Sequence, residues 1–444
     1  MSEITHDVPR GVERSQVLAW AVWDTGSAGV SAVVVTFVFS VYLTGTVGKD
    51  LPGGVPPASW LGRALAIAGL TIAVLAPVIG VWVEDPRRRR ITLTVLTGLV
   101  VGLVSAMSLI RDRPEYLWPG LALLAIGAAC GDLASVPYNA MLRQLTTPQN
   151  SGRISGFGLA SAFVGSVGLL LLVYFGCIDG KGATRGFLQL PIRDGMNVRI
   201  AMLLAAGWLA VLATPLLLTA HKLPSPAEAV SSTTRGVLGG YRRLWRDLVA
   251  EWHRDRNLVY YLLAAAVFRD GLAGVFTFGG VLGVSAYGIS SADVLIFGVV
   301  ASVVAALGAV FGGFLDDRIG SKPVIIGSLA SIIAAGLAMM ALSGPRAFWI
   351  TGLLLCLFIG PAQASARTLL LRMSSAGKEG VAFGLYTMTG RAVSFVAPWL
   401  FSVFVDLFGA VRAGMGGLCL VMAVGLLGLL MVRVPQRVAA ADIG

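Results

Sequence analysis

Twelve apolar segments, each about 20 to 28 residues long, follow one another through this chain of 444 residues, with short polar connections between them. A helix rises about 1.5 Å per residue and the hydrocarbon layer of a membrane is about 30 Å thick, so about 20 apolar residues cross it once. The sequence therefore predicts an all-α integral membrane protein with 12 transmembrane helices. The spans are expected near residues 16–43, 58–84, 91–110, 118–142, 154–176, 199–219, 258–284, 292–315, 323–343, 347–371, 382–405 and 412–432.

The composition and the placement of the basic residues agree with a polytopic membrane protein. Apolar residues make up 56% of the chain and charged residues 13%, and the 56 glycines suit helices that pack closely in lipid. With the N-terminus inside, the even-numbered connections, the span ends beside them and both tails hold 22 of the 34 lysines and arginines, and the odd-numbered connections with their span ends hold nine. The other three, Arg63, Arg269 and Arg391, fall within spans. Both termini are therefore expected in the cytoplasm.

The ends of the chain and its cysteines predict no processing and no metal site. The first 15 residues are polar and include acidic side chains, so we expect no cleavable signal, with the first span acting as the signal anchor. The cysteines, which lack any metal-type spacing, are expected to be core thiols: Cys130, Cys177, Cys356 and Cys419. No cofactor is expected.

The chain repeats itself in two halves. The segment AVWDTGSAGV from Ala21 aligns with AVFRDGLAGV from Ala266, and GVWVEDPRRR from Gly80 aligns with GFLDDRIGSK from Gly313. Six spans followed by six of the same orientation predict parallel repeats related by an axis along the membrane normal.

The expected parts are a cytoplasmic tail (1–15), a six-helix bundle (16–219), a linker (220–257), a second bundle (258–432) and a cytoplasmic tail (433–444). Apolar residues at helical spacing in the linker predict an amphipathic helix on the cytoplasmic membrane surface, with a solvated helix as the alternative.

The connection after the eighth span resembles the signature of the major facilitator superfamily. A carboxylate at a helix boundary caps exposed N–H groups and pairs with arginine, and glycine permits a tight turn, so such a cluster can latch a gate. In the first-half copy, Glu84 replaces the usual aspartate, and four arginines stand where the turn glycine is usual. These arginines either contribute to the latch or serve only to fix the orientation of the spans in the membrane. The predicted gating residues are Gly80, Glu84, Gly313, Asp317, Arg318, Gly320 and Lys322.

Several further stretches resemble the autophagy-related vacuole effluxer family and its bacterial relatives, long called the unknown major facilitator family. They are WAVWDTGSA at Trp20, VPYNAML at Val136 with Arg143 in place of the usual proline, GRISGFGLA at Gly152, FRDG at Phe268, GPAQASARTLLLR at Gly360 and FGLYTMTGR at Phe383. The resemblance implies a secondary transporter with the major facilitator fold. It also implies a connection with amino-acid efflux, which is associated with the vacuolar members.

Charged and polar residues within spans are the candidate transport residues. A charge at mid-bilayer costs about 2.5 to 3.5 kcal/mol on insertion scales, so it is expected to face a partner or a watery cavity. The expected substrate or proton pathway comprises Asp24, Asp132, Asn139, Asp270, Arg367 and Arg391.

Each of these candidates has a specific role to test. Because burial favours the protonated carboxyl group, Asp24 or Asp270 is the leading proton-coupling candidate. The alternative is that Asp24 with Arg391, and Asp270 with Arg269 or another helix, form structural salt bridges. Arg391 is a candidate contact for a substrate carboxylate and Asn139 for an amide hydrogen bond, whereas Arg367 either lines the pathway or reaches the headgroups.

Two other features of the spans carry structural predictions. Trp20 is expected to be an interfacial anchor, and Pro398 is expected to kink the eleventh span.

Other function classes find less support in the residues. The only histidines, His6, His221 and His253, lie in predicted cytoplasmic segments, and no nucleotide-binding loop or hydrolase elbow is present, so an enzyme is disfavoured. A drug or lipid exporter is disfavoured because GFGLASAFVGSVGLL in the fifth span lacks the glycine-proline antiporter signature, and a non-transporting sensor or scaffold remains an alternative. We predict a monomeric, proton-coupled carrier of a small molecule in the inner membrane of a bacterial cell, with no nucleic-acid partner.

Overall fold

The computed structural model describes residues 13–49, 57–180, 183–223 and 256–433. Within these residues, twelve helical segments are long and apolar enough to cross a membrane. Each overlaps one of the predicted spans, so the all-helical membrane fold is confirmed. The predicted linker helix falls largely in residues 224–255, outside the described part.

The helices and strands run in chain order through two groups. The first group comprises α1 (Arg14–Ser31), α2 (Phe39–Tyr42), α3 (Pro57–Trp82), α4 (Pro86–Met107), α5 (Leu117–Ala140), α6 (Leu142–Leu145), α7 (Ser151–Val173) and α8 (Met196–Thr219). π-Helical turns extend the first and fifth spans over Ala32–Phe37, Leu43–Val47 and Tyr174–Ile178, and β1 (Thr184–Arg185) pairs with β2 (Leu190–Pro191) in a short antiparallel hairpin. The second group comprises α10 (Asn257–Tyr287), α11 (Ser291–Ile319), α12 (Ser321–Ala341), α13 (Pro345–Met373), α14 (Glu379–Val393), α15 (Val396–Phe408) and α16 (Gly414–Met431).

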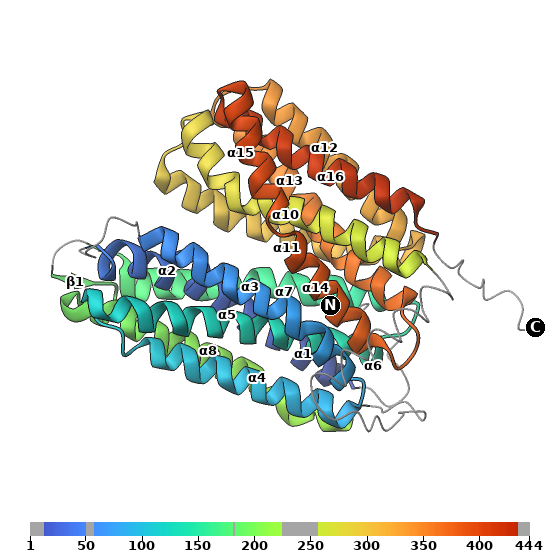
Figure 1. Cartoon of the computed structure of the whole chain (residues 1–444), viewed down its shortest axis with the longest axis horizontal. Helices are drawn as coiled ribbons and strands as arrows, with labels where there is room; N and C mark the ends of the chain where they lie inside the picture. Colours follow the sequence, from blue (N-terminus) through green and yellow to red (C-terminus); the bar gives the residue numbers. More distant parts are fainter. Residues whose placement is uncertain (1–12, 50–56, 181–182, 224–255, 434–444) are drawn as a thin grey trace, which may run out of the picture.

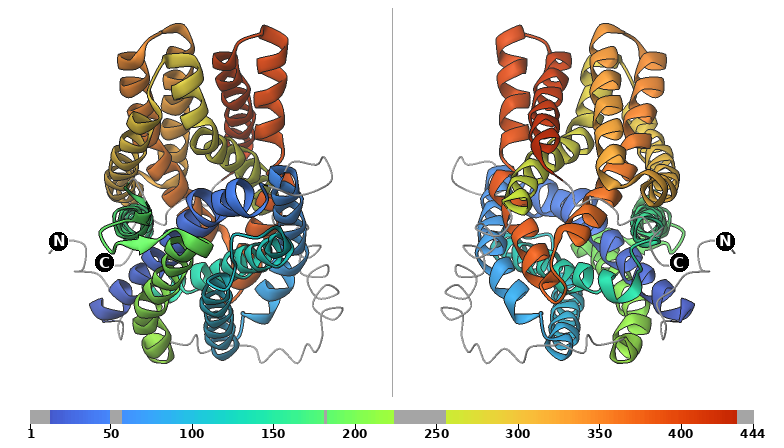
Figure 2. Two further views of the ribbon diagram at one scale, coloured as in Figure 1. Left: turned by 90° about the vertical axis from the view of Figure 1, so that its left-hand side faces the viewer. Right: turned by 90° about the vertical axis from the view of Figure 1, so that its right-hand side faces the viewer.

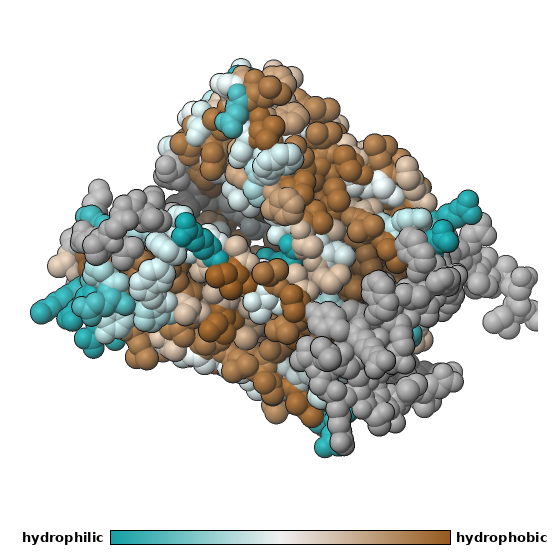
Figure 3. Space-filling view, in the orientation of Figure 1, coloured by the Kyte–Doolittle hydropathy of each residue, from teal (hydrophilic) through white to brown (hydrophobic). Residues whose placement is uncertain are grey.

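The two groups lie side by side and diverge toward one end, as Figure 1 shows. We call the end that carries β1 and β2 the hairpin face, and the opposite end, where α1 begins and α16 ends, the terminal face. Seen end-on in Figure 2, the second group (yellow to red) stands above the first (blue to green). Figure 3 shows apolar side chains over the sides and a hollow between the groups that opens toward the hairpin face.

The groups touch near the terminal face through two helix pairs that contain glycines. Gly152 of α7 lies against Gly313 of α11, where a Cβ atom built on Gly152 would lie 2.7 Å from the carbonyl oxygen of Gly313. Gly80 of α3 meets the backbone of Gly380 of α14 in the same way. Small residues let helix backbones approach this closely in a membrane. The terminal face is therefore closed while the hairpin face is open.

The eleventh span is broken, as the position of Pro398 predicts. Helix α14 ends at Val393 and α15 begins at Val396. A proline ring clashes with the carbonyl group four residues earlier, which here belongs to Ser394 in the break. The freed N–H of Ala397 donates to Oδ2 of Asp270 at 2.6 Å. Asp270 of α10 thus caps the N-terminus of α15 from a neighbouring helix.

The cysteines agree with the core-thiol prediction in three of four cases. All four are free thiols, of which Cys177, Cys356 and Cys419 are buried and Cys130 is partly buried.

Candidate functional site

An ion pair in the middle of the molecule joins the two helix groups. Oδ2 of Asp24, on α1, lies 3.7 Å from Nη1 of Arg367, on α13. Arg367 also donates to Oδ1 of Asn139 at 3.4 Å and to the carbonyl oxygen of Ser155 at 3.1 Å. Side chains of Asp24 and Arg367 are only 18% and 12% exposed. Arg367 therefore points inward between the groups, and the alternative that it reaches the headgroups is wrong.

A second ion pair, nearer the hollow, joins Asp132 of α5 to Arg391 of α14. Its side chains are more open, at 36% and 40% exposed. The predicted alternative of a bridge between Asp24 and Arg391 is wrong, because each of these residues has another partner. Which aspartate meets which arginine depends on how helices of different halves face one another.

Arg269 and Asp270 are neighbours in sequence that point to different surroundings. Successive side chains on a helix are about 100° apart, so the two cannot face the same partner. While Asp270 caps α15, the guanidinium of Arg269 lies 3.7 Å from the ring centroid of Tyr386 and Nη1 donates to the Tyr386 carbonyl oxygen at 3.2 Å. No carboxylate of the described residues lies within 4.0 Å of Arg269, so the predicted bridge between these two is wrong.

The charged residues described above form a central layer: Asp24, Asp132, Arg269, Arg367 and Arg391. An aromatic stack supports this layer beside Asp24. Tyr138 is sandwiched between Trp20 and Trp23, with ring centroids 4.6 Å and 4.5 Å away. Nε1 of Trp20 donates to the carbonyl oxygen of Tyr138 at 3.1 Å, and Nε1 of Trp23 to Oγ1 of Thr97 at 3.1 Å. Trp20 is fully buried. The prediction that it anchors the protein at the membrane interface is wrong, because its indole packs inside the bundle.

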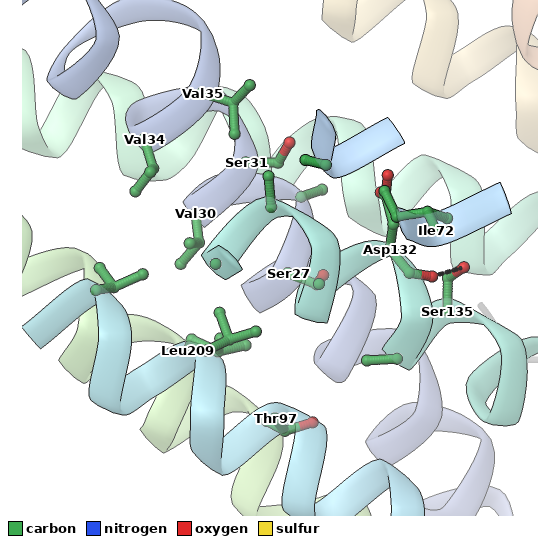
Figure 4. Close-up of a pocket in the computed structure, with 18 of the residues that line it drawn as sticks. Ser27, Val30, Ser31, Val34, Val35, Ile72, Thr97, Asp132, Ser135 and Leu209 are labelled. Atoms are coloured by element: carbon green, nitrogen blue, oxygen red, sulfur yellow. Dashed lines mark hydrogen bonds between the residues drawn. The ribbon is translucent and has the colours of Figure 1, made fainter. Parts of the chain in front are cut away.

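A cavity of about 370 Å³ lies within the first helix group and reaches Arg391 (Figure 4). Its polar lining comes from Asp24, Ser27, Ser31, Thr97, Asp132, Ser135 and Arg391. Most of the remaining wall is apolar, including Val30, Val34, Val35, Ile72 and Leu209. In Figure 4, Asp132 and Ser135 come from one helix, and the Ser135 hydroxyl donates to the carbonyl oxygen of Asp132. The cavity therefore joins a charged end to an apolar interior.

The signature aspartate of the second half closes one side of the terminal face. Asp317, at the end of α11, accepts from the backbone N–H groups of Gly152 and Arg153 at 2.8 Å and 2.9 Å. These are the first N–H groups of α7, which have no partner within their own helix. Asp317 also lies 3.4 Å from Nε of Arg153 and 3.4 Å from Nη2 of Arg372. The carboxylate thus links helices of both groups.

Arg372, near the end of α13, extends this network. Its Nη1 lies 2.6 Å from Oδ1 of the buried Asp316 and donates to Oγ of Ser321 at 2.7 Å. Nη2 donates to Oγ of Ser151 at 3.0 Å, at the first residue of α7. The fork of the guanidinium therefore holds both groups at once.

A separate cluster closes the other side of the terminal face. Glu379, the first residue of α14, lies 2.6 Å from Nε of Arg143 and 3.9 Å from Nη2 of Arg89. Arg143 also donates to the carbonyl oxygens of Leu371 and Ser374 at the end of α13, the latter at 2.7 Å. Arg89 is 3% exposed, so one of the four clustered arginines is built into the contact between the groups. We call these three charged residues the Glu379 cluster.

The remaining signature residues lie around these clusters. Glu84 lies near Arg89. Gly320 joins α11 to α12 with φ at 94°, a conformation that glycine adopts readily. Lys322 donates to the carbonyl oxygens of Leu430 and Val432 at the end of α16, at 3.1 Å and 2.8 Å, so these two bonds stay within its own helix group. Arg318 is exposed, and the guanidinium groups beside Asp317 come from Arg153 and Arg372.

Sequence reasoning missed most partners of the terminal face. The missed residues are Arg89, Arg143, Arg153, Asp316, Arg372 and Glu379. A usable signal was present, because each stands within a few residues of the end of an apolar span. A charged residue at the end of a span can bind a residue of the other helix group, or it can only determine the orientation of the helix in the membrane. The residue type does not distinguish these two roles.

Relatives of the chain agree with this architecture. Residues 58–442 match the family described as "Vacuole effluxer Atg22 like". The chain is 22% identical over 411 residues to the "Uncharacterized MFS-type transporter YxiO" of Bacillus subtilis (strain 168), covering 92% of each chain. It is 23% identical over 283 residues to "Autophagy-related protein 22-1" of Aspergillus fumigatus, covering 59% of this chain and 45% of that protein.

Solved structures with the same fold belong to the major facilitator superfamily. The transporter FucP in the outward conformation superposes with a TM-score of 0.70 at 13% identity, over 95% of this chain and 100% of that one. The proton:xylose symporter XylE bound to 6-bromo-6-deoxy-D-glucose gives 0.69 at 14% identity, over 94% of each chain. The expected fold and the expectation of a transporter rather than an enzyme are confirmed. The chain belongs to the Atg22-like vacuole effluxer family of major facilitator transporters.

Proposed function

We propose that the protein is a proton-coupled secondary transporter that moves a small solute across the cell membrane by alternating access. The excess of basic residues in the even-numbered connections and tails supports a cytoplasmic terminal face. In that orientation the hollow opens outward and the glycine contacts close the cytoplasmic side. The bacterial relative supports the cell membrane as the location.

The ion pair between Asp24 and Arg367 is the observation that carries proton coupling. The two residues belong to different helix groups, so their attraction stabilises the contact between the groups. Protonation of Asp24 removes its charge and with it most of this attraction. A proton bound at Asp24 therefore shifts the equilibrium between arrangements of the two groups. Asp270 is a less suitable coupling residue, because its carboxylate caps α15.

The clusters at the terminal face are proposed to be the latch that alternating access must break. Asp317 holds the first turn of α7, and Glu379 holds Arg143 of the opposite group. A ligand or proton that favours the opposite arrangement must supply the free energy that separates these pairs. The latch thus sets how readily the cytoplasmic side opens.

Amino acids are the substrate class that we propose to test first. The cavity has a carboxylate, Asp132, and a guanidinium, Arg391, at one end and apolar walls beyond them. The charged end suits the polar groups of an amino acid, and the apolar walls suit an uncharged side chain. A volume of about 370 Å³ is near the lower end of the range of ligand pockets and suits a small metabolite better than a lipid.

Proton coupling is tested by transport currents in proteoliposomes on a solid support. An equimolar mixture of the twenty common amino acids is applied with and without an imposed pH gradient. We expect a substrate-dependent current that the gradient increases in the unaltered protein, and at least a tenfold loss of that increase in Asp24→Asn, since the removed step is essential. Asp406→Asn is the matched control, because Asp406 is exposed near the hairpin face.

The outcomes separate the parts of the proposal. Equal pH dependence in Asp24→Asn and in the unaltered protein would remove Asp24 from coupling. If amino acids give no current but a cationic dye or a lipid analogue does, the proposed substrate class is wrong and the protein transports drug-like or lipid molecules. Absence of net flux and exchange for every solute would favour a sensor or scaffold.

A further inference from the structure

Arg269 occupies the position in the second half that Asp24 occupies in the first. Aligning AVWDTGSAGV from Ala21 with AVFRDGLAGV from Ala266 places Asp24 over Arg269. The first helices of two parallel repeats are related by an axis through the centre of the molecule. Asp24 lines the cavity and faces the other group. The repeat therefore places a positive charge opposite a negative one across the central axis.

The contacts of Arg269 leave its charge without a carboxylate. The side chain is half-buried near the middle of α10, about 18 Å along the helix from its first residue. Its partners are the ring and the carbonyl oxygen of Tyr386. The guanidinium also lies beside Gly390, where a Cβ atom would lie 3.2 Å from Nη1. No acidic side chain of the described residues lies within 4.0 Å, whereas Arg367 and Arg391 each have an aspartate.

The arginines of the central layer outnumber its paired aspartates by one. Three guanidinium groups, those of Arg269, Arg367 and Arg391, face two carboxylates, those of Asp24 and Asp132. Asp270 does not supply the missing charge, because it binds the positive end of α15. An uncompensated charge in the middle of a membrane protein is expensive and typically marks a ligand or ion pathway. A single carboxylate would balance the layer, and a guanidinium binds a carboxylate through two parallel hydrogen bonds.

We propose that Arg269 binds the carboxylate of the transported solute, so that the substrate carries one carboxylate and is held from the second half of the molecule. This rests on the proposed transport function and adds the group by which the solute is recognised. Tyr386 positions the guanidinium, because its ring lies under the cation and its carbonyl oxygen fixes one nitrogen. Gly390 keeps space beside the guanidinium where any side chain would intrude.

Ligand-induced stabilisation of the purified full-length protein tests this without measuring transport. The probes are valine, methionine and phenylalanine, each compared with its decarboxylated amine and its deaminated carboxylic acid. We expect at least one amino acid and its matching carboxylic acid to raise the melting temperature, and the amine to leave it unchanged. In Arg269→Gln the apparent affinity for the carboxylate probes should fall about 10- to 100-fold, since a charged hydrogen-bond donor is lost. Arg269→Lys should retain part of it.

Matched variants keep the test specific. Arg346→Gln is the control, because Arg346 is exposed near the hairpin face and outside the charged layer. Unchanged carboxylate affinity in a folded Arg269→Gln protein, an equal shift by the amines, or no shift with any carboxylate would each overturn the proposal. The two proposals fail separately, because proton coupling is read from the pH drive in Asp24→Asn and anion binding from the melting temperature of the Arg269 variants.

Discussion

At the scale of single residues, the central layer is organised by a few charges that bind across the two helix groups. Asp24, Asp132 and the arginines facing them are costly in a membrane, and the structure offsets this cost by pairing them. The pairs are partly buried, so they are sensitive to the loss of either member. Arg269 differs because it rests on an aromatic ring instead of a carboxylate.

The pairing of Asp24 with Arg367 predicts a non-additive effect on stability. Arg367→Ala leaves a mostly buried carboxylate without its cation and should destabilise this conformation by about 3 to 5 kcal/mol. Adding Asp24→Asn should restore much of the loss, because the unpaired charge is then gone. Thermal unfolding in detergent measures the cycle, with Arg346→Ala as the control. Additive losses in the double variant would show that the two residues do not interact.

At the scale of helices, the break in the eleventh span and the close helix pairs follow from local chemistry. Pro398 interrupts the helix, and Asp270 satisfies the N–H that the break exposes. Glycines on α3, α7, α11 and α14 remove the side chains that would keep these helices apart. Both features are visible as residue types in the sequence, but their partners are not.

The capping role of Asp270 predicts a stability effect without an effect on coupling. Asp270→Ala should destabilise the protein by about 1 to 3 kcal/mol, because the Ala397 N–H loses its acceptor inside the protein. Asp270→Asn keeps an acceptor and should cost less. Thermal unfolding and the pH dependence of transport are measured together. A normal melting temperature with a lost pH drive in Asp270→Asn would move the coupling role to Asp270.

The contact between α7 and α11 predicts an unusual cost for a single methyl group. Alanine in place of glycine normally stabilises a helix by about 1 kcal/mol. At Gly152 the added Cβ would lie 2.7 Å from the carbonyl oxygen of Gly313, so Gly152→Ala should separate the helices and reduce transport. Gly279→Ala is the control, because nothing lies within 4 Å of a Cβ at that site of α10. Equal transport rates in the two variants would contradict this account.

At the scale of the whole molecule, the charge clusters of the terminal face oppose its opening. The Glu379 cluster and the Asp317 contacts are both on this face, whereas the hollow between the groups opens toward the hairpin face (Figure 3). Under the proposed alternating access, the equilibrium between the two arrangements then depends on residues far from the ion pairs of Asp24 and Asp132.

Weakening this latch should change which side of the central hollow is reached by a reagent. Glu379→Gln leaves Arg143 and Arg89 without their carboxylate, and a loss of about 3 kcal/mol moves a two-state equilibrium by about a hundredfold. Ser31→Cys reports the state, because Ser31 is exposed in the cavity. We expect slower labelling by a membrane-impermeant maleimide from outside the cell in the double variant than in Ser31→Cys alone.

The same experiment contains its control. Glu115→Gln changes an exposed glutamate near the hairpin face and should leave the labelling rate of Ser31→Cys unchanged. Faster labelling after Glu379→Gln would mean that the intact cluster restricts access through the hairpin face, which would contradict its role as a latch of the terminal face.

Hydropathy and repeated motifs predicted the number of spans, their order, the duplication of the halves and the family. These properties are local, because each apolar segment must be long enough to cross lipid and each repeat keeps its own motifs. The partners of the buried charges emerge only in the folded protein: Asp24 pairs with Arg367, Asp132 pairs with Arg391, Asp270 caps α15 and Arg269 lies on Tyr386. The physical reason is that such partners come from different helices, whose rotation and depth are set by packing between the halves. The hydropathy of a segment indicates whether its helix crosses the lipid layer, but not which residues of other helices its side chains contact.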